Sequence, residues 1–510
     1  MKFKISFALS ASAFLALAFF ALTSIRAAED GQSPAEDGTL PALTAIAGAA
    51  TMQSHTSQYI AEVSDDIGAR VTGSPEAAKA IAWGIEKMKA MGLENVHVEP
   101  WELFRGWKRI SADAELVEPI HRRLMIDSLG WVGSTPTGGA EGEMVPVNPY
   151  QAADEIKNNS KNWRGKILFT LSKGASPADS LLAFARFGDL IQAAQSAGAI
   201  AVVGGSSGRA SAGMHLTHTG IIGFDRWFEI PVVSMAAEDQ EQIARYLEAG
   251  RTVRLKINVQ NEFTNGPVES ANVVGEIRGT QNPEQVVVVG GHLDSWDLAS
   301  GATDNGCGTA TTLGAAEAIV KSGMKPRRTI RFVLFTGEEQ GLDGSRAYVK
   351  KHAAEMANHL ADVILDNGQG PVVTLQLGGH TDLIPIVQQF TPALQAFGKI
   401  GVDDEPVFDT DTGPFILAGL PGINLDQDSP EYRFTHHSPV DTLDKIDPAI
   451  LDRNAAIQAL TAFWIADRPE RLASPWPAEK TARMLVERRQ ADFLKASGLW
   501  TFGNLGESQR

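Results

Sequence analysis

Three apolar segments in the second half of the chain, each long enough for a buried strand, are followed by side chains of types that bind metals. These segments and the side chains after them are Val286–Val289 with His292 and Asp294, Thr329–Phe335 with Glu338 and Glu339, and Val363–Leu365 with Asp366. A fourth group of this kind is His437, in the run HHSPVDT. In an open α/β sheet, ligands gather outside the carboxyl ends of the strands, so these side chains are expected to meet in one pocket. The pattern therefore predicts an α/β fold with a polar site at one edge of its sheet.

The expected pocket holds two histidines and three or four carboxylates, a nitrogen and oxygen ligand set that divalent metals accept. A single catalytic zinc ion normally takes three protein ligands, so the surplus of carboxylates indicates two ions. Two ions that share a carboxylate and a water molecule lower the pKa of that water and stabilise a tetrahedral intermediate, which predicts hydrolysis. Zn²⁺ is the default metal, and Co²⁺ or Mn²⁺ would suit the same ligands.

Four runs follow one another along the chain: GGHLDSWDLASGATDNGCG, FTGEEQGLDGS, ILDNG and HHSPVDT. With these runs, residues 45–465 resemble the di-zinc exopeptidases, a family of aminopeptidases and glutamate carboxypeptidases, and most closely its carboxypeptidase Q branch. The resemblance implies a mixed, mostly parallel central sheet flanked by helices, the zinc exopeptidase fold. It also implies an inserted, β-rich protease-associated domain beside the pocket, which would favour short peptides as substrates.

The resemblance implies a role for each candidate residue. It divides the metal ligands around a shared carboxylate: His292 and Asp366 on one zinc ion, Glu339 and His437 on the other, and Asp304 bridging both. Glu338 would be the general base, which takes a proton from the attacking water and delivers it to the leaving amine. Asp294 could accept the ring N–H of His292 and so support catalysis, and Asp441 could do the same for His437.

Several of these residues also have a purely structural interpretation. Asp304 could cap the helix that follows it, and a Glu-Glu pair is usually solvated surface. Cys307 is expected to be a small buried hydrophobe and not a ligand. His436 adjoins His437, so one of the two at most should ligate, and His437 is preferred. His215 and His218 are three residues apart, but no carboxylate flanks them closely, which favours surface or loop histidines.

Changes in composition and residue pattern along the chain predict five parts: a signal peptide at 1–28, an N-terminal part of the catalytic domain at 29–129, a protease-associated insert at 130–262, the catalytic metallopeptidase domain at 263–470 and a helical tail at 471–510. Lys2 and Lys4 precede a long apolar run, as in secretory signal peptides. Short apolar runs and Gly-rich turns mark the insert. The segment 479–495 has alternating charges, which predicts a solvated helix that could pack at a dimer contact.

These observations favour a secreted or periplasmic metallo-exopeptidase that hydrolyses dipeptides or other short peptides, with an uncleaved N-terminal anchor as the alternative to secretion. The formal net charge of −16 opposes binding to nucleic acid. A single cysteine allows no disulfide within the chain. Resemblance to dimeric members of the family indicates a homodimer.

Three other functions stay open from the sequence: an aminopeptidase acting on longer peptides, a metal- and peptide-binding module without turnover, and a glutaminyl cyclase-like transferase. Presence of Glu338 beside all five candidate ligands speaks against the module. The recognised terminus of the substrate is not decided. Asp411–Phe415 and Gly378–His380 are candidates for selectivity, with ordinary loop structure as the alternative.

Overall fold

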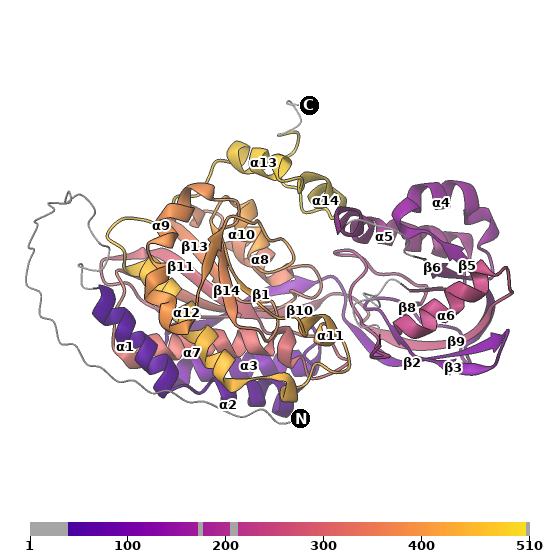
Figure 1. The fold of residues 1–510 in the computed structure, drawn as a ribbon, viewed down its shortest axis with the longest axis horizontal. Coiled ribbons are helices and arrows are strands. Elements are labelled where there is room, and N and C mark those ends of the chain that lie inside the picture. Colours follow the sequence, from indigo (N-terminus) through magenta and orange to yellow (C-terminus); the bar gives the residue numbers. More distant parts are fainter. Residues whose placement is uncertain (1–38, 172–176, 205–212, 506–510) are drawn as a thin grey trace, which may run out of the picture.

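The computed structural model describes residues 39–171, 177–204 and 213–505, and the expected signal peptide at 1–28 lies outside them. Within these residues, none of the helices has the length and apolar character that crossing a membrane requires. The chain forms a larger and a smaller lobe, each built on an eight-stranded mixed sheet (Figure 1). The expected α/β class is therefore confirmed.

The sheet of the larger lobe is parallel at its centre. Its strands, in spatial order, are β1 (Glu94–Leu103), β10 (Val268–Ile277), β12 (Arg328–Phe335), β11 (Asn282–His292), β13 (His359–Ile364), β16 (Gly422–Gln427), β14 (Val372–Gln376) and β15 (Gly401–Asp403). β11 pairs in parallel with both β12 and β13, and β13 pairs in parallel with β16. The carboxyl ends of these four strands therefore lie at the same edge of the sheet.

Helices cover both faces of this sheet. One face packs against α3 (Pro75–Ala90), α7 (Cys307–Ser322) and α12 (Pro448–Asp467), and the other face packs against α8 (Asp343–Lys351) and α10 (Gly413–Leu417) (Figure 1). Helices α1 (Thr39–Met52) and α2 (Thr56–Ala61) form an outer layer on α7 and α12. The valines of β11 are buried along its length, because a strand covered on both faces has no solvated side. The short helix α9 (Ile384–Gln388) lies between β14 and β15, and the short helix α11 (Tyr432–Thr435) lies between β16 and α12.

The N-terminal helices follow local sequence signals in part. Pro75 begins α3, and the Ser74 side chain accepts a hydrogen bond from the Ala77 N–H, which caps the helix. Helix α2 is short and is continued by the π-helical turn Glu62–Ile67. Helix α1 packs against α12 and α7.

The smaller lobe is inserted between β1 and β10, which pair with each other antiparallel at the point of departure, Leu103 opposite Val268. Its sheet has the order β3 (Arg122–Leu124), β2 (Trp107–Glu118), β9 (Arg254–Phe263), β5 (Ala140–Val147), β6 (Lys166–Thr170), β7 (Ala201–Val203), β8 (Val232–Met235), β4 (Ile126–Ser128). Helices α4 (Ala152–Asn159), α5 (Pro177–Ala197) and α6 (Ala237–Glu248) pack on it.

The expected start of the insert at residue 130 cuts through this second sheet, because β2, β3 and β4 precede it. β2 pairs along its length with β9, which lies near the end of the insert. We therefore propose that the inserted domain extends from about Trp107 to Phe263. The sequence pattern did not assign β2, β3 and β4 to the insert, because they lack the Gly-rich turns that mark its later strands.

The C-terminal tail runs from the larger lobe to the smaller lobe, where α14 lies beside α5 (Figure 1). It consists of α13 (Ala478–Glu487) and α14 (Ala491–Ala496), separated at Arg489, whose φ of 60° is left-handed. The prediction of one solvated helix was wrong, since Leu485, Phe493 and Leu494 are buried and α14 contacts α5 of the smaller lobe. The alternating charges occupy only the outer side of the tail.

Candidate metal centre and active site

Five of the predicted side chains meet at the carboxyl edge of the central sheet. His292 is the last residue of β11, Glu339 follows β12, and Asp366 follows β13. Asp304 lies in the turn Ala302–Gly306 that leads into α7, and His437 follows α11. Three of these positions are the ends of adjacent parallel strands, so the sheet itself brings them together.

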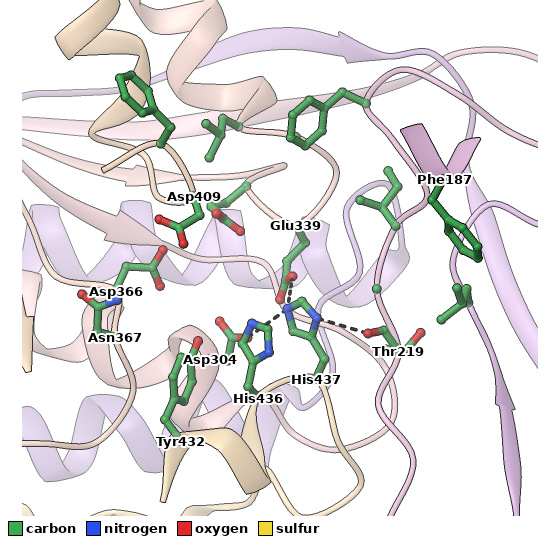
Figure 2. Close-up of a pocket in the computed structure, with 18 of the residues that line it drawn as sticks. Phe187, Thr219, Asp304, Glu339, Asp366, Asn367, Asp409, Tyr432, His436 and His437 are labelled. Carbon is green, nitrogen blue, oxygen red and sulfur yellow. Dashed lines mark hydrogen bonds and ion pairs between the residues drawn. The ribbon is translucent and has the colours of Figure 1, made fainter. Parts of the chain in front are cut away.

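Asp304 lies between the two histidines and presents a different oxygen to each. Its Oδ1 is 3.2 Å from Nε2 of His292, and its Oδ2 is 3.2 Å from Nε2 of His437. On the first side, Asp366 Oδ1 is 3.1 Å from His292 Nε2. On the second side, Glu339 Oε2 is 2.8 Å from His437 Nε2 (Figure 2). The site thus consists of two imidazole and carboxylate pairs around one shared carboxylate.

Buried atoms without hydrogen-bond partners face the middle of this group: Nε2 of His292, Oδ2 of Asp304 and Oε1 of Glu339. Such orphaned atoms are costly in a protein interior unless a further group satisfies them. The ligand atoms of His292, Asp304 and Asp366 also lie within 4.8 Å of one another. Nitrogen and carboxylate oxygen donors at this spacing fit divalent metal ions.

The electrostatics of the site point the same way. Burial raises the pKa of Asp366 to about 6 and that of Glu339 to about 7, even with a histidine beside each. Burial alone would lower the pKa of His437, but Glu339 and Asp304 outweigh it and raise that pKa to about 10. Burial therefore makes these two carboxyl groups keep their protons at a higher pH than they would in water. A bound cation would favour their charged form and so remove the cost of burying them.

Glu338 and Glu339 are adjacent but face different surroundings. The Glu339 side chain is 1% exposed and contacts His437, whereas the Glu338 side chain is 13% exposed and 3.9 Å from His292 Nε2. Burial raises the pKa of Glu338 well above its usual value, although His292 opposes this. Glu338 therefore borders the cavity without the close pairing of a ligand, as a proton-transfer group requires.

Main-chain carbonyls orient both histidines. His292 Nδ1 lies 3.0 Å from the carbonyl oxygen of Asp294, while the Asp294 carboxylate is farther, at 3.5 Å. That carboxylate instead accepts hydrogen bonds from the Thr72 hydroxyl at 2.9 Å and the Glu338 N–H at 3.4 Å. The backbone of Asp294 thus holds the histidine ring, and its side chain joins β11 to the turn that carries Glu338.

Asp441 does not contact His437, and this prediction was wrong. Its carboxylate accepts hydrogen bonds from the Thr303 N–H at 2.5 Å, the Thr303 hydroxyl at 2.8 Å and the Asp304 N–H at 3.2 Å. Asp441 therefore fixes the turn that presents the shared carboxylate. The ring Nδ1 of His437 lies 3.3 Å from the carbonyl oxygen of Thr219, in the smaller lobe (Figure 2).

Arg70 is a supporting residue that sequence reasoning missed. Its buried guanidinium donates hydrogen bonds to five carbonyl oxygens, those of Leu293, Val63, Gly68, Ser300 and Gly301. Burial lowers its pKa to about 10, which leaves it charged. Arg70 thereby joins residues 63–68 to both ends of the loop between His292 and Asp304. The only sequence signal was its place in a Gly-rich turn typical of the family.

The remaining candidates are mostly structural. The His436 ring stacks on His437 with centroids 3.7 Å apart, and its Nε2 is 3.8 Å from Asp304, longer than the contacts of His437. Cys307 is buried and its thiol donates to the Thr303 carbonyl, in agreement with a packing role. His380 stacks on Trp476, away from the cavity. His215 is exposed, as expected, but His218 is buried.

A cavity of about 420 Å³ is lined by Glu338 and by four side chains of the centre, Asp304, Glu339, Asp366 and His437. The smaller lobe contributes Leu129, Phe187, Thr219 and Ile221 to its wall, the tail contributes Phe493, and the larger lobe contributes Phe408, Asp409 and Tyr432. Figure 2 shows Asp409 and Asp366 with their carboxylates directed into the same space. Pattern reasoning missed Asp409, Thr219 and Phe493, because they come from loops and a tail that only the tertiary fold brings to the site.

The family comparisons agree with this site. The model of peptidase family M28 matches residues 272–462, a range that includes all five side chains of the centre. Carboxypeptidase Q of Mus musculus is 32% identical over 411 residues, which cover 80% of this chain and 85% of the relative. Carboxypeptidase Q of Homo sapiens is 32% identical over 421 residues, 82% of this chain and 87% of the relative.

Solved structures of peptidases have a similar fold. A peptidase M28 precursor from Shewanella amazonensis has a TM-score of 0.76 at 28% identity and covers 86% of this chain and 99% of its own. A zinc aminopeptidase from Bacillus subtilis shares the fold, with a TM-score of 0.61 at 19% identity over 83% of this chain and 97% of its own.

The fold, the centre and these relatives define a metallopeptidase, an enzyme that hydrolyses peptide bonds. The relatives named carboxypeptidase Q match most of this chain and most of their own length. The chain belongs to peptidase family M28.

Proposed function

We propose that this metallopeptidase binds two zinc ions and hydrolyses dipeptides and other short peptides that carry a free amino terminus. The observation that carries the two-ion proposal is the position of Asp304, whose two oxygens face the two different histidines. A single ion would leave one of these pairs without a cation. In the proposed assignment, His292 and Asp366 hold one ion, Glu339 and His437 hold the other, and Asp304 belongs to both.

Ions at this centre would polarise the scissile carbonyl and activate a water molecule for attack. Glu338 borders the cavity and is not closely paired, which supports its role as the group that removes a proton from the attacking water. Its raised pKa favours holding that proton until the leaving amine takes it. Asp294 supports the reaction indirectly, by holding the turn of Glu338 and the ring of His292.

Glu338→Gln tests this division of roles. The variant should retain both metal ions and lose at least about 10²-fold in hydrolysis, the low end of the contribution of a positioned general base. Glu339→Gln is the matched control at the neighbouring position, and it should lose metal. Metal content is measured by elemental analysis and turnover by product formation. Loss of metal from Glu338→Gln would exchange the two roles.

The charges of the cavity support recognition of an amino terminus. Of the described residues that line it, none is Lys or Arg, the side chains that normally hold a substrate carboxylate. Asp409 is a carboxylate beyond the five ligands and Glu338, and burial raises its pKa. An α-ammonium group beside Asp409 would satisfy that charge. The wall from the smaller lobe and the tail limits the length of the peptide.

A panel of unblocked, N-acetylated and C-amidated dipeptides and tripeptides tests the recognised terminus, with products identified by mass spectrometry. The enzyme should cleave unblocked and C-amidated peptides and reject N-acetylated ones. Asp409→Asn should raise KM for unblocked dipeptides about tenfold, which corresponds to ~1.4 kcal/mol. Cleavage of N-acetylated peptides that requires a free carboxylate would establish a carboxypeptidase and contradict the proposal.

We also infer secretion or periplasmic export from the signal-like segment 1–28, and the inserted domain as a protease-associated domain that narrows access to the site. Its position on the cavity wall supports the second inference. A homodimer stays a prediction from the family resemblance. The N-terminal sequence of the mature protein and its cellular fraction test export, and retention of residues 1–28 on a membrane-bound product would favour the anchor.

A further inference from the structure

A three-residue segment of the inserted domain, 218–220, lies directly against the loop that carries His437. The Thr219 N–H donates a hydrogen bond to the carbonyl oxygen of His437 at 2.8 Å. The ring of His218 lies with Nδ1 2.7 Å from the carbonyl oxygen of His436, and this ring is buried. The main chain of the proposed ligand loop is thus bound by another domain of the protein.

The same segment orients the imidazole of His437. Its Nδ1 lies 3.3 Å from the Thr219 carbonyl oxygen, and a carbonyl can only accept, so Nδ1 carries the proton. Nε2 is then the ring nitrogen left to exchange its proton for a metal ion, on the side of Asp304 and Glu339. His437 also has a φ of 56°, in the left-handed region that a residue with a side chain enters only when its surroundings hold it there.

Arg109 of β2 ties this segment to the larger lobe. Its guanidinium donates to the Thr219 hydroxyl at 2.9 Å and to the Ser128 carbonyl. It also pairs with both carboxylate oxygens of Asp297, at 2.8 and 3.0 Å. Asp297 lies in the loop that follows β11 and His292. Because the Arg109 side chain is only 9% exposed, water weakens this paired interaction less than it would a surface ion pair.

We propose that segment 218–220, with Arg109 and Asp297 as positioning residues, is part of the metal centre, so that metal binding at His437 and docking of the inserted domain are thermodynamically coupled. The inference rests on the two-ion assignment proposed above. Groups that orient a histidine ligand typically change metal affinity 10- to 100-fold when they are removed. Coupling is reciprocal, so metal at His437 should also hold the inserted domain in place.

Cobalt titration of the metal-free protein tests the proposal, with Co²⁺ as the probe and its visible absorption as the signal. Arg109→Ala should weaken one of two Co²⁺ sites at least about tenfold and leave the other within about threefold. Arg109→Lys should recover part of the affinity, because it can still pair with Asp297. Arg254→Ala is the matched control, an arginine of the same sheet whose ion pair with Glu141 is exposed. It should titrate like the unchanged protein.

A second variant and a second signal separate positioning from general destabilisation. Asp297→Asn keeps the shape of the side chain and should show the same selective loss if Arg109→Ala fails to fold. Added Co²⁺ should slow proteolysis of the inserted domain in the unchanged protein, and less so in either variant. Equal weakening of both sites, or no weakening, would overturn the proposal. One bound equivalent in the unchanged protein would instead reject the two-ion assignment on which it rests.

Discussion

Replacing Arg70 by Met should destabilise the protein far more than loss of a surface charge. Five carbonyl oxygens depend on this one guanidinium, two of them in residues 63–68 and three in the single loop 293–301. Hydrogen bonds to a charged donor contribute about 1.5–3 kcal/mol each, roughly 7–15 kcal/mol in total. Relief from burying a charge and rehydration of the outer carbonyls offset most of this. A net loss of about 3–5 kcal/mol is the usual result of breaking a buried charged network.

The assay is urea unfolding in excess zinc, compared at the transition midpoint. Arg254→Met is the matched control, because Arg254 and Glu141 are 40% and 44% exposed, and its midpoint should stay unchanged. Arg70→Met should also weaken metal binding, since Leu293 and Gly301 lie at the two ends of the loop between the ligands His292 and Asp304. A loss below about 1 kcal/mol would refute the reasoning, because that is the net value of one ordinary hydrogen bond.

Two further predictions concern burial. Asp362 is fully buried on β13, and burial raises its pKa well above the usual value although the Thr412 hydroxyl donates to it at 2.6 Å. A raised folded-state pKa means that the stability contributed by this carboxyl is lost as pH rises from the unfolded value of about 4 toward the folded one. The free energy of unfolding of Asp362→Asn, relative to that of the unchanged protein, should therefore rise by roughly 1.4 kcal/mol per pH unit between pH 5 and the folded-state pKa of Asp362. Urea unfolding measures both free energies. A difference that stays constant over pH 5–8 would contradict this. Phe493→Ala should raise KM about tenfold for dipeptides with a large apolar residue, as expected for ~1.4 kcal/mol of lost apolar contact, and little for glycine dipeptides. Trp500→Ala, on the same tail outside the cavity wall, is its control, and equal effects of the two variants would argue against a substrate contact.

Sequence patterns predicted the part of the site that the sheet builds. A buried strand that ends in a polar side chain has a fixed relation to its parallel neighbours, so His292, Glu339 and Asp366 could be expected to meet. Asp304 and His437 lie in irregular turns, so their assignment to particular ions came from the family resemblance and not from the strand pattern. Glu338 and Glu339 have different surroundings, and so differ as the family resemblance led us to expect.

The supporting groups could not be predicted, for physical reasons. Thr219 acts through its main-chain atoms, which every residue possesses, so its identity carries no signal. Asp441 was assigned to the nearest histidine in sequence, whereas its carboxylate serves backbone N–H groups of a distant turn. The tail was interpreted from its charged side alone, and Phe493 reaches the cavity only because the chain turns at Arg489.

The most direct test of the account is the number of metal ions bound by the purified protein and by Asp304→Asn, counted by native mass spectrometry after zinc loading. The account predicts two zinc ions in the unchanged protein and weakened binding of both in Asp304→Asn, because this carboxylate faces both histidines. One ion in the unchanged protein, or two tightly bound ions in the variant, would contradict a centre built around a shared Asp304.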